Sequence, residues 1–359
     1  MAQYKDIIFL LGAGASVEAM IPASGEMIDR IEELLKQDDE WKSYLRLYDH
    51  LKSAIYYSAG LKGLFQKEVL YNIETLVNTL YELERNEEHP LYPFIASWNS
   101  RFVALAETDF SKVKEFRRLI LRKLKNWMSP DGISKAGYYR GLIQLQRDIN
   151  FPIQIFSLNY DLCVERLNTT DFRVETGFEG VGPEYTWDWE RFEDVDSGPT
   201  PPEMYLYKLH GSINWKRDES KNLYCVEQTE GIPAESMQLI FGREFKLEAA
   251  DPYLFYAYQL RKFSLQAKLI VSVGYGFGDE HVNEILAQAL RRELTSRLFV
   301  ISNCETAESV QKRAQQIVSL LGVNDDQIRV HQGKTKRFLE TNELKNVLVE
   351  QIAPGDSAF

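Results

Sequence analysis

The chain has 359 residues, of which 44% are hydrophobic and 26% are charged, so it is long enough for two domains or for one large domain with an insertion. This composition excludes a disordered chain and indicates a sizeable core. With 42 basic and 53 acidic residues the net charge is −11, which gives no general electrostatic reason to bind nucleic acid.

The three cysteines, Cys163, Cys225 and Cys304, are far apart and never stand in a Cys-x-x-Cys spacing. They cannot form a four-cysteine zinc module, and we expect no bound metal. A reducing, cytoplasmic location is the simpler interpretation. No apolar run approaches the roughly 18 residues of a membrane span, and the N-terminus lacks the features of a signal peptide.

The first predicted element is a strand, Ile7–Leu11, which runs into the turn Gly12-Ala13-Gly14-Ala15-Ser16 and then a helix over Glu26–Leu35. A glycine turn that leads toward a helix can direct backbone N–H groups at a phosphate. The candidate phosphate-binding residues are therefore Gly12, Ala13, Gly14 and Ser16. Val17 stands where the dehydrogenase fingerprint requires its third glycine, which disfavours an ordinary NAD-dependent dehydrogenase. The alternative is a tight strand–helix turn that binds no ligand.

Residues 39–148 show apolar side chains at three- and four-residue spacing and almost no alternation, so we expect an all-helical insertion there. The clearest helices are expected at Trp41–Ser58, Ile73–Glu84 and Val113–Trp127. The flanking segments, residues 1–38 and 149–352, would then form one catalytic domain. The stretch Lys112–Lys125 carries seven basic residues and one acidic residue, which indicates a solvated basic helix face or a docking surface for an acidic partner or nucleic acid.

Strands alternate with helices in the remaining chain, and a segment rich in Trp, Asp, Gly and Pro, Glu184–Pro202, is expected to be a long loop. This alternation predicts an α/β protein with a doubly wound, largely parallel, Rossmann-like sheet. The expected strands are 151–158, Tyr205–Leu209, Met237–Phe241, Lys268–Val273, Arg297–Ser302 and Gln327–His331, and the expected helices are Tyr253–Gln266, His281–Leu294 and Ala307–Leu321.

Polar side chains follow two of these strands: Asn159 and Asp161 after the first, and His210 after the second. The ends of buried strands are where open α/β sheets build sites. An amide such as Asn159 can hold a water or a hydroxyl, Asp161 can orient it, and a histidine can accept a proton near neutral pH. The alternatives are that Asn159 and Asp161 cap the following helix, and that His210 is satisfied by a backbone carbonyl.

Two later strand ends complete the set of candidates. The loop Gly274-Tyr275-Gly276-Phe277-Gly278 is rich enough in glycine for its backbone to approach a ligand. Asp279, which follows it, is expected to cap the next helix rather than to act in catalysis. Asn303, after the strand Arg297–Ser302, could contact a ribose or an adenine edge.

Taken in order, these motifs resemble the sirtuin-like superfamily, over roughly residues 5–35 and 150–335. The motifs are Gly12–Ser16, Met20-Ile21-Pro22, Leu158–Asp161, His210-Gly211, Gly274–Gly278 and Asn303. The resemblance implies that NAD+ binds here, held by the first glycine turn and by Pro22, Gly274, Tyr275 and Asn303. It implies catalytic roles for Asn159, His210 and Asp161.

The departures from protein-deacylating sirtuins are the missing zinc module, Ala23-Ser24-Gly25 after Ile21-Pro22, and Leu158 before Asn159. These changes resemble the bacterial sirtuin-like effectors of antiphage defence, which implies an NAD+ glycohydrolase that releases nicotinamide and ADP-ribose. That branch implies a homo-oligomer and a partner such as a P-loop ATPase (HerA-type translocase) or another defence sensor, with nucleic acid reached only through the partner. The alternative is an NAD+- or ADP-ribose-binding regulatory subunit, or a scaffold, without turnover.

Overall fold

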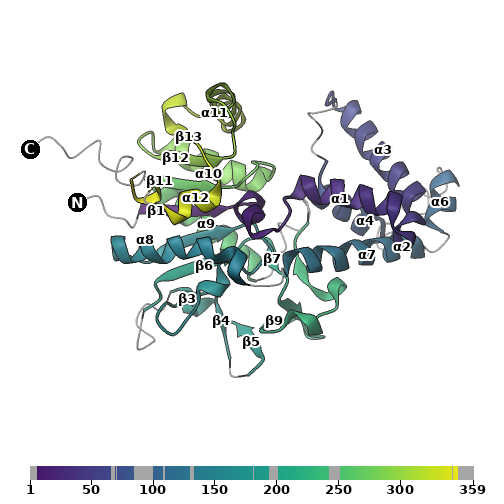
Figure 1. Cartoon of the computed structure of the whole chain (residues 1–359), viewed down its shortest axis with the longest axis horizontal. Helices are drawn as coiled ribbons and strands as arrows, with labels where there is room; N and C mark the ends of the chain where they lie inside the picture. Colours follow the sequence, from purple (N-terminus) through teal and green to yellow (C-terminus); the bar gives the residue numbers. More distant parts are fainter. Residues whose placement is uncertain are drawn as a thin grey trace, which may run out of the picture.

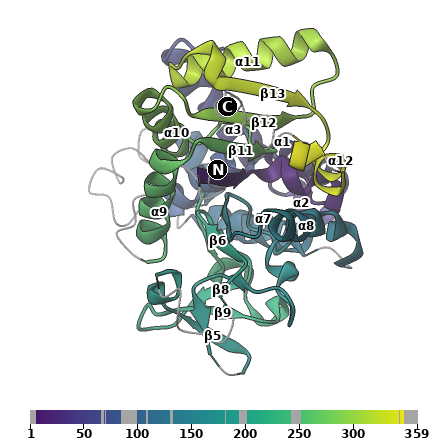
Figure 2. The ribbon, with the colours of Figure 1, turned by 90° about the vertical axis from the view of Figure 1, so that its left-hand side faces the viewer.

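The structure is a computed structural model that describes residues 6–65, 69, 71–84, 100–107, 110–129, 133–180, 182–193, 201–241, 251–341 and 343–346. Within these residues a seven-stranded parallel sheet has the order β13-β12-β11-β1-β2-β6-β3 (Figures 1 and 2). Its strands are β1 (Ile7–Leu11), β2 (Ile153–Ser157), β3 (Val174–Glu175), β6 (Met204–Lys208), β11 (Leu269–Val273), β12 (Arg297–Ser302) and β13 (Ile328–Gln332). The predicted parallel Rossmann-like sheet is confirmed.

The chain winds away from the central strand β1 in both directions. It adds β2 and then β6 on one side, and later β11, β12 and β13 on the other. All residues of β1, β2, β6 and β11 are buried, which explains their nearly continuous apolar sequences. In a doubly wound sheet the carboxyl ends of the strands where the winding reverses are where ligands bind, and here that edge follows β1 and β11.

Helices cover both faces of the sheet because alternate strand residues point to opposite faces. Ile8 and Leu10 pack in the core beneath α9 (Tyr253–Gln266), α10 (Glu280–Arg292) and α11 (Ala307–Leu321). Phe9 and Leu11 pack on the other side. That face carries α1 (Ser24–Gln37), α8 (Gly141–Ile149), α12 (Thr335–Glu340) and the 3₁₀ segments η2 (Ala13–Ala19) and η5 (Ile133–Arg140).

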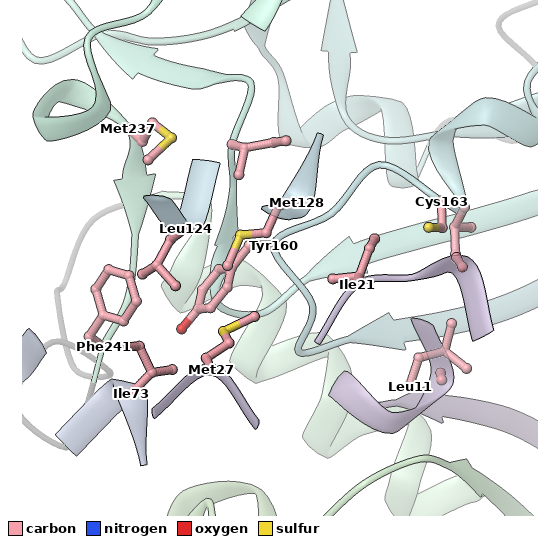
Figure 3. Packing of buried hydrophobic residues seen from close by; sticks show 14 of the residues in the cluster. Leu11, Ile21, Met27, Ile73, Leu124, Met128, Tyr160, Cys163, Met237 and Phe241 are labelled. Carbon is pink, nitrogen blue, oxygen red and sulfur yellow. The ribbon is translucent and has the colours of Figure 1, made fainter. Parts of the chain in front are cut away.

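The described residues between 39 and 128 are largely helical, as predicted, and their helices extend to one side of the sheet as a helical layer (Figure 1). They are α2 (Asp39–Lys42), α3 (Leu45–Leu61), α4 (Ile73–Glu84), α6 (Ser100–Ala106) and α7 (Ser111–Met128). The segment expected as one helix, Trp41–Ser58, is divided into two. Their buried side chains belong to the same hydrophobic cluster as one face of the sheet. In Figure 3, Leu124 and Met128 of α7 lie beside Met27 of α1 and Tyr160, which follows β2. The division into domains at residues 38 and 149 stays a prediction.

A second, antiparallel sheet has the order β4-β5-β9-β8, and its strands β5, β8 and β9 lie below β6 in Figure 2. Its strands are β4 (Phe178–Glu179), β5 (Glu184–Trp187), β8 (Trp215–Arg217) and β9 (Leu223–Val226), while β7 (Gly211–Ser212) pairs separately with β10 (Gln238–Leu239). The prediction of a loop over Glu184–Pro202 is therefore wrong at its start, since β5 and the 3₁₀ turn η7 (Trp189–Phe192) lie there. Residues 194–200 of that segment lie outside the described residues.

Candidate active site at the carboxyl edge of the sheet

The glycine turn after β1 packs directly against the loop after β11. The N–H of Gly12 donates to Val273 O and the N–H of Gly14 donates to Gly274 O, both at 2.9 Å. A Cβ on Gly12 would lie 2.6 Å from Tyr275 Cα, and a Cβ on Gly14 would lie 2.8 Å from Gly274 O. Gly274 has a φ of +66°, and its own Cβ would lie 2.1 Å from Ala15 N. These glycines therefore permit a backbone-to-backbone contact that side chains would prevent.

Ser16, at the end of that turn, forms the centre of a buried polar cluster. Its hydroxyl donates to Asp161 Oδ2 at 2.8 Å, and Asn159 Nδ2 donates to Ser16 Oγ at 3.3 Å. The hydroxyl of Tyr139, from η5, lies 3.0 Å from the same oxygen. Ser16 and Tyr139 are fully buried, and Asn159 and Asp161 are 7% and 5% exposed. Three predicted site residues thus meet in what we call the Ser16 cluster (Ser16, Tyr139, Asn159 and Asp161).

Tyr139 was missed by the sequence interpretation, which placed it in the helical insertion. Burial holds the pKa of its phenol well above the ordinary value, so the group stays neutral. The next residue back, Tyr138, donates to the carbonyl of Ala15 at 2.6 Å. The paired tyrosines therefore hold the glycine turn from the side of η5. Nothing in their local sequence pattern marks them as neighbours of residue 16.

The backbone after β2 is held by a buried lysine. Asp161 Oδ1 accepts from the N–H of Cys163 at 2.9 Å, so this carboxylate stabilises a turn in addition to its bond with Ser16. Lys208, the last residue of β6, donates to the carbonyl of Asp161 and lies 2.9 Å from Glu165 Oε1. Its side chain is 2% exposed. The loop that carries Asn159 and Asp161 is thereby tied to the neighbouring strand.

His210 stands beside Asn159 at the same edge. Ser157 and Lys208 are register partners, so Asn159 and His210 each lie two residues beyond a paired position on adjacent strands. His210 Nε2 lies 2.9 Å from Asp279 Oδ2, and the side chain is 6% exposed. Among the described residues, neither His210 Nδ1 nor Asn159 Oδ1 has a hydrogen-bond partner. Two buried polar atoms at neighbouring strand ends are thus left without partners, which is uncommon in folded proteins.

The predicted cap of α10 is confirmed, and it has a second role. Asp279 Oδ1 accepts from the N–H groups of His281 and Val282, while its other oxygen contacts His210. The hydroxyl of Tyr275 accepts from the N–H of Asp279 at 3.2 Å and lies 2.9 Å from Asn283 Oδ1. Tyr275 is buried within its own loop. The assignment of Asp279 to the cap alone missed its contact with His210.

Two predicted ligand contacts, Pro22 and Asn303, take no part in the side-chain hydrogen bonds that the described residues form in the Ser16 cluster. Pro22 is buried between η2 and the start of α1, and Asn303 is exposed after β12. The roles of Pro22, Gly274, Tyr275 and Asn303 toward a ligand stay predictions.

The side chains of Asn159 and His210 are almost fully buried in this structure. Two cavities, of about 710 Å³ and about 230 Å³, lie elsewhere. The larger is bordered by β3, β5 and β9, and the smaller lies between α4, α7 and β10, and neither is lined by Asn159 or His210.

In the described residues no group of three His, Cys, Asp or Glu side chains could hold a metal ion. Among the described helices, none combines the length and the hydrophobicity that a membrane span requires.

The family described as "SIR2-like domain" matches residues 154–321, which include Asn159, Asp161, His210 and Asp279. This match supports a place for the chain in the sirtuin-like superfamily. The first glycine turn lies outside the matched segment.

Solved structures with similarity to this chain include a complex of a Sir2 homologue with NAD, at 14% identity and a TM-score of 0.45 over 97% of this chain and 90% of that one. A mutant Sir2 homologue in complex with 2′-O-acetyl ADP-ribose has the same identity and TM-score, and covers 97% and 93%. A Sir2 structure with a p53 peptide and NAD+ has 11% identity and a TM-score of 0.36, and covers 95% and 93%. No curated protein matches the sequence.

Proposed function

We propose that this protein is an NAD+ glycohydrolase that cleaves NAD+ to nicotinamide and ADP-ribose. The observation that carries the proposal is the pair of unpartnered buried atoms, Asn159 Oδ1 and His210 Nδ1, at adjacent strand ends. An amide oxygen can accept a hydrogen bond from a water or a ribose hydroxyl, and an imidazole nitrogen can accept its proton. The match of residues 154–321 to a SIR2-like domain supports NAD+ as the substrate.

The reaction breaks the bond between the anomeric carbon of the ribose and the nicotinamide nitrogen. Nicotinamide leaves as a neutral molecule because the pyridinium nitrogen takes the bonding electron pair. The oxygen of water forms the new bond to the anomeric carbon, and its proton passes to His210 Nδ1. Asn159 would hold the water or a ribose hydroxyl, and the Asp161 carboxylate would orient Asn159 through Ser16. Positioning and electrostatic stabilisation supply most of the catalysis in such a scheme.

The structure alters the expected part played by the first glycine turn. The N–H groups of Gly12 and Gly14 already donate to carbonyls of the β11 loop. A bound pyrophosphate would compete with those bonds, so we assign these two glycines mainly to the close approach of the two loops. Ala13 stays a candidate donor, and Ser16 acts through the Ser16 cluster.

The test is incubation of the protein with NAD+ and chromatography for nicotinamide, ADP-ribose and cyclic ADP-ribose. We expect Asn159→Ala and His210→Ala to lower turnover by about 10²–10⁴, the range found when a general base or its positioning is lost. His50→Ala, in α3 of the helical layer, is the control and should leave turnover unchanged. Undiminished hydrolysis by both site variants would refute the assignment.

The second candidate is a module that binds NAD+ or ADP-ribose without turnover. The burial of Asn159 and His210, which are 7% and 5% exposed, supports it, because the attacking water must reach both groups for hydrolysis. A binding isotherm for NAD+ with no release of nicotinamide would establish this candidate and exclude the first.

The resemblance to antiphage effectors supports a wider proposal, in which hydrolysis depletes cellular NAD+ during infection. The homo-oligomer, the P-loop ATPase partner and the cytoplasmic location belong to the same proposal. Mass measurement of the protein alone, and together with the product of a neighbouring gene, tests the assembly. NAD+ levels in infected cells that carry wild-type or His210→Ala protein test the role in defence.

A further inference from the structure

We infer that Asp279 is a positioning residue for His210, which fixes the imidazole as the tautomer with its proton on Nε2 and leaves Nδ1 as the basic nitrogen. The inference deepens the proposed function and rests on it only for the catalytic consequence. Its structural part stands on the contact between two side chains that are 6% and 5% exposed, at 2.9 Å.

The two oxygens of Asp279 are both acceptors. Oδ1 accepts from the backbone N–H groups of His281 and Val282, at 2.9 and 3.2 Å. Those N–H groups stand at the N-terminus of α10, where the helix dipole favours a negative charge. The carboxylate is therefore stabilised as an ion, and its Oδ2 can only accept from His210 Nε2. The proton of a neutral imidazole must then lie on Nε2, so the lone pair lies on Nδ1.

The other imidazole nitrogen, Nδ1, has no partner in the described part of the chain. It is buried, and the ring of Tyr160 lies 6.2 Å from that of His210, between centroids. A buried imidazole nitrogen without a donor nearby is costly in a purely structural histidine. A general base, by contrast, needs such an unpartnered nitrogen lone pair before the substrate binds.

A crossing loop makes this pair possible. His210 follows β6 and Asp279 follows β11, and these strands are separated in the sheet by β1 and β2. Three inter-strand spacings amount to roughly 14 Å, and the five steps from Gly274 to Asp279 can span about 17 Å. The loop therefore runs along the carboxyl edge of the sheet and passes over the end of β1. It contacts the backbone of Gly12 and Gly14 there, where no side chain is in the way.

The decisive variant is Asp279→Asn. Asparagine is also a good helix cap, so its Oδ1 can keep the bonds to α10. The Nδ2 group would then face His210 Nε2 as a donor, which forces the imidazole proton onto Nδ1 and removes the free lone pair. Asp188→Asn is the matched control, because Asp188 caps η7 through the N–H of Glu190 at a distance from the site.

The test is ¹⁵N NMR of protein labelled at histidine, with the His210 signals assigned by their loss in His210→Ala. In the wild type we expect the protonated-nitrogen shift at Nε2, and in Asp279→Asn we expect it at Nδ1 or a mixture. Asp188→Asn should match the wild type. A wild-type imidazole with its proton on Nδ1, or an unchanged tautomer in Asp279→Asn, would overturn the inference, whether or not the protein hydrolyses NAD+.

The catalytic consequence is tested by a double-mutant cycle. Asp279→Asn should lower kcat on NAD+ by about 10²-fold or more, a loss within the range for general-base catalysis, and should have no further effect in the His210→Ala background. Additive losses in the two backgrounds would contradict the coupling. If the wild type does not turn over NAD+, the proposed function fails, and the NMR result still decides the role of Asp279.

Discussion

Lys208 is a buried cation on which the loop of the candidate site depends. Its ammonium group lies 2.9 Å from Glu165, a carboxyl whose pKa burial raises above 4.5 despite the opposing effect of the lysine. A raised pKa in the folded state means that ionised Glu165 is unfavourable. Its contribution to stability is therefore greatest below pH 4.5 and declines as the pH rises through the raised value.

We expect Lys208→Met to raise the pKa of Glu165 further and to lower the free energy of unfolding by about 3 kcal/mol at about pH 8. The loss should be smaller at about pH 4.5, where the raised pKa of Glu165 favours its protonated form. Urea unfolding at both pH values measures it. Lys216→Met is the control, because its pair with Glu184 is partly exposed and should contribute less than about 1 kcal/mol. Equal losses for Lys208→Met at the two pH values would contradict this account.

At the scale of single residues, much of the candidate site could be located from the sequence, but its connections could not. Asn159, Asp161 and His210 could be predicted because buried strands end just before them. The contact between His210 and Asp279 could not, since it depends on a loop that crosses two strands. The contact of Tyr139 with Ser16 could not be predicted either, because it depends on the packing of η5 on η2.

Among the elements, the two loops that follow β1 and β11 are held together through glycine. We expect Gly14→Ala to destabilise the fold by about 1–3 kcal/mol, because the new methyl group would lie 2.8 Å from Gly274 O and the backbone must shift. The shifted loop carries Asp279, so NAD+ turnover should fall as well. Denaturant unfolding and the nicotinamide assay measure the two effects.

Gly25 provides the matched control for this substitution. It lies in the first turn of α1 and is exposed, and a methyl group added there would meet no neighbouring atom within 4 Å. Gly25→Ala should leave turnover unchanged and stability equal or higher, by up to about 1 kcal/mol. Similar losses in both variants would show that the contact with Gly274 is not the cause.

The elements of the main sheet could be predicted well, and those of the small sheet could not. Strand β12 and helices α4, α9 and α11 have the predicted bounds. Helices α4 and α11 have apolar side chains at helical spacing, and β12 has a continuous apolar run. The strands of the small sheet have two to four residues, and β5 alternates only between exposed and half-buried positions. Such a strand is stabilised mainly by pairing with a distant strand, as Tyr185 pairs with Cys225. The local sequence does not indicate which segment that partner is.

Across the whole molecule, the helical layer and one face of the sheet share a single hydrophobic cluster. The hydroxyl of Tyr160, next to Asn159, donates to Ile240 O at 2.6 Å and lies 3.4 Å from Glu74 of α4. The candidate site is thus in contact with the helical layer through one tyrosine. A change in the packing of α4 or α7 would therefore alter the position of Tyr160 and, through it, of Asn159.

We expect the protein to unfold in one cooperative transition, because no boundary separates the core of the layer from that of the sheet within the described residues. Tryptophan fluorescence and far-ultraviolet circular dichroism should give the same midpoint in denaturant. Leu124→Ala, in α7, should lower that midpoint for both signals and cost about 2–5 kcal/mol, since Leu124 is fully buried. Two separate transitions would show that the layer and the sheet fold independently.

The contact between His210 and Asp279 also sets an order in time during synthesis. The glycine turn at residues 12–16 leaves the ribosome first, the Ser16 cluster is complete once Asp161 has emerged, and the imidazole of His210 follows. Its carboxylate partner is made last, 69 residues later. A nascent or truncated chain that ends before Asp279 therefore carries Ser16, Asn159, Asp161 and His210, but lacks the carboxylate that holds the imidazole. Under the proposed function, the base is therefore held in place only after residue 279 has been made.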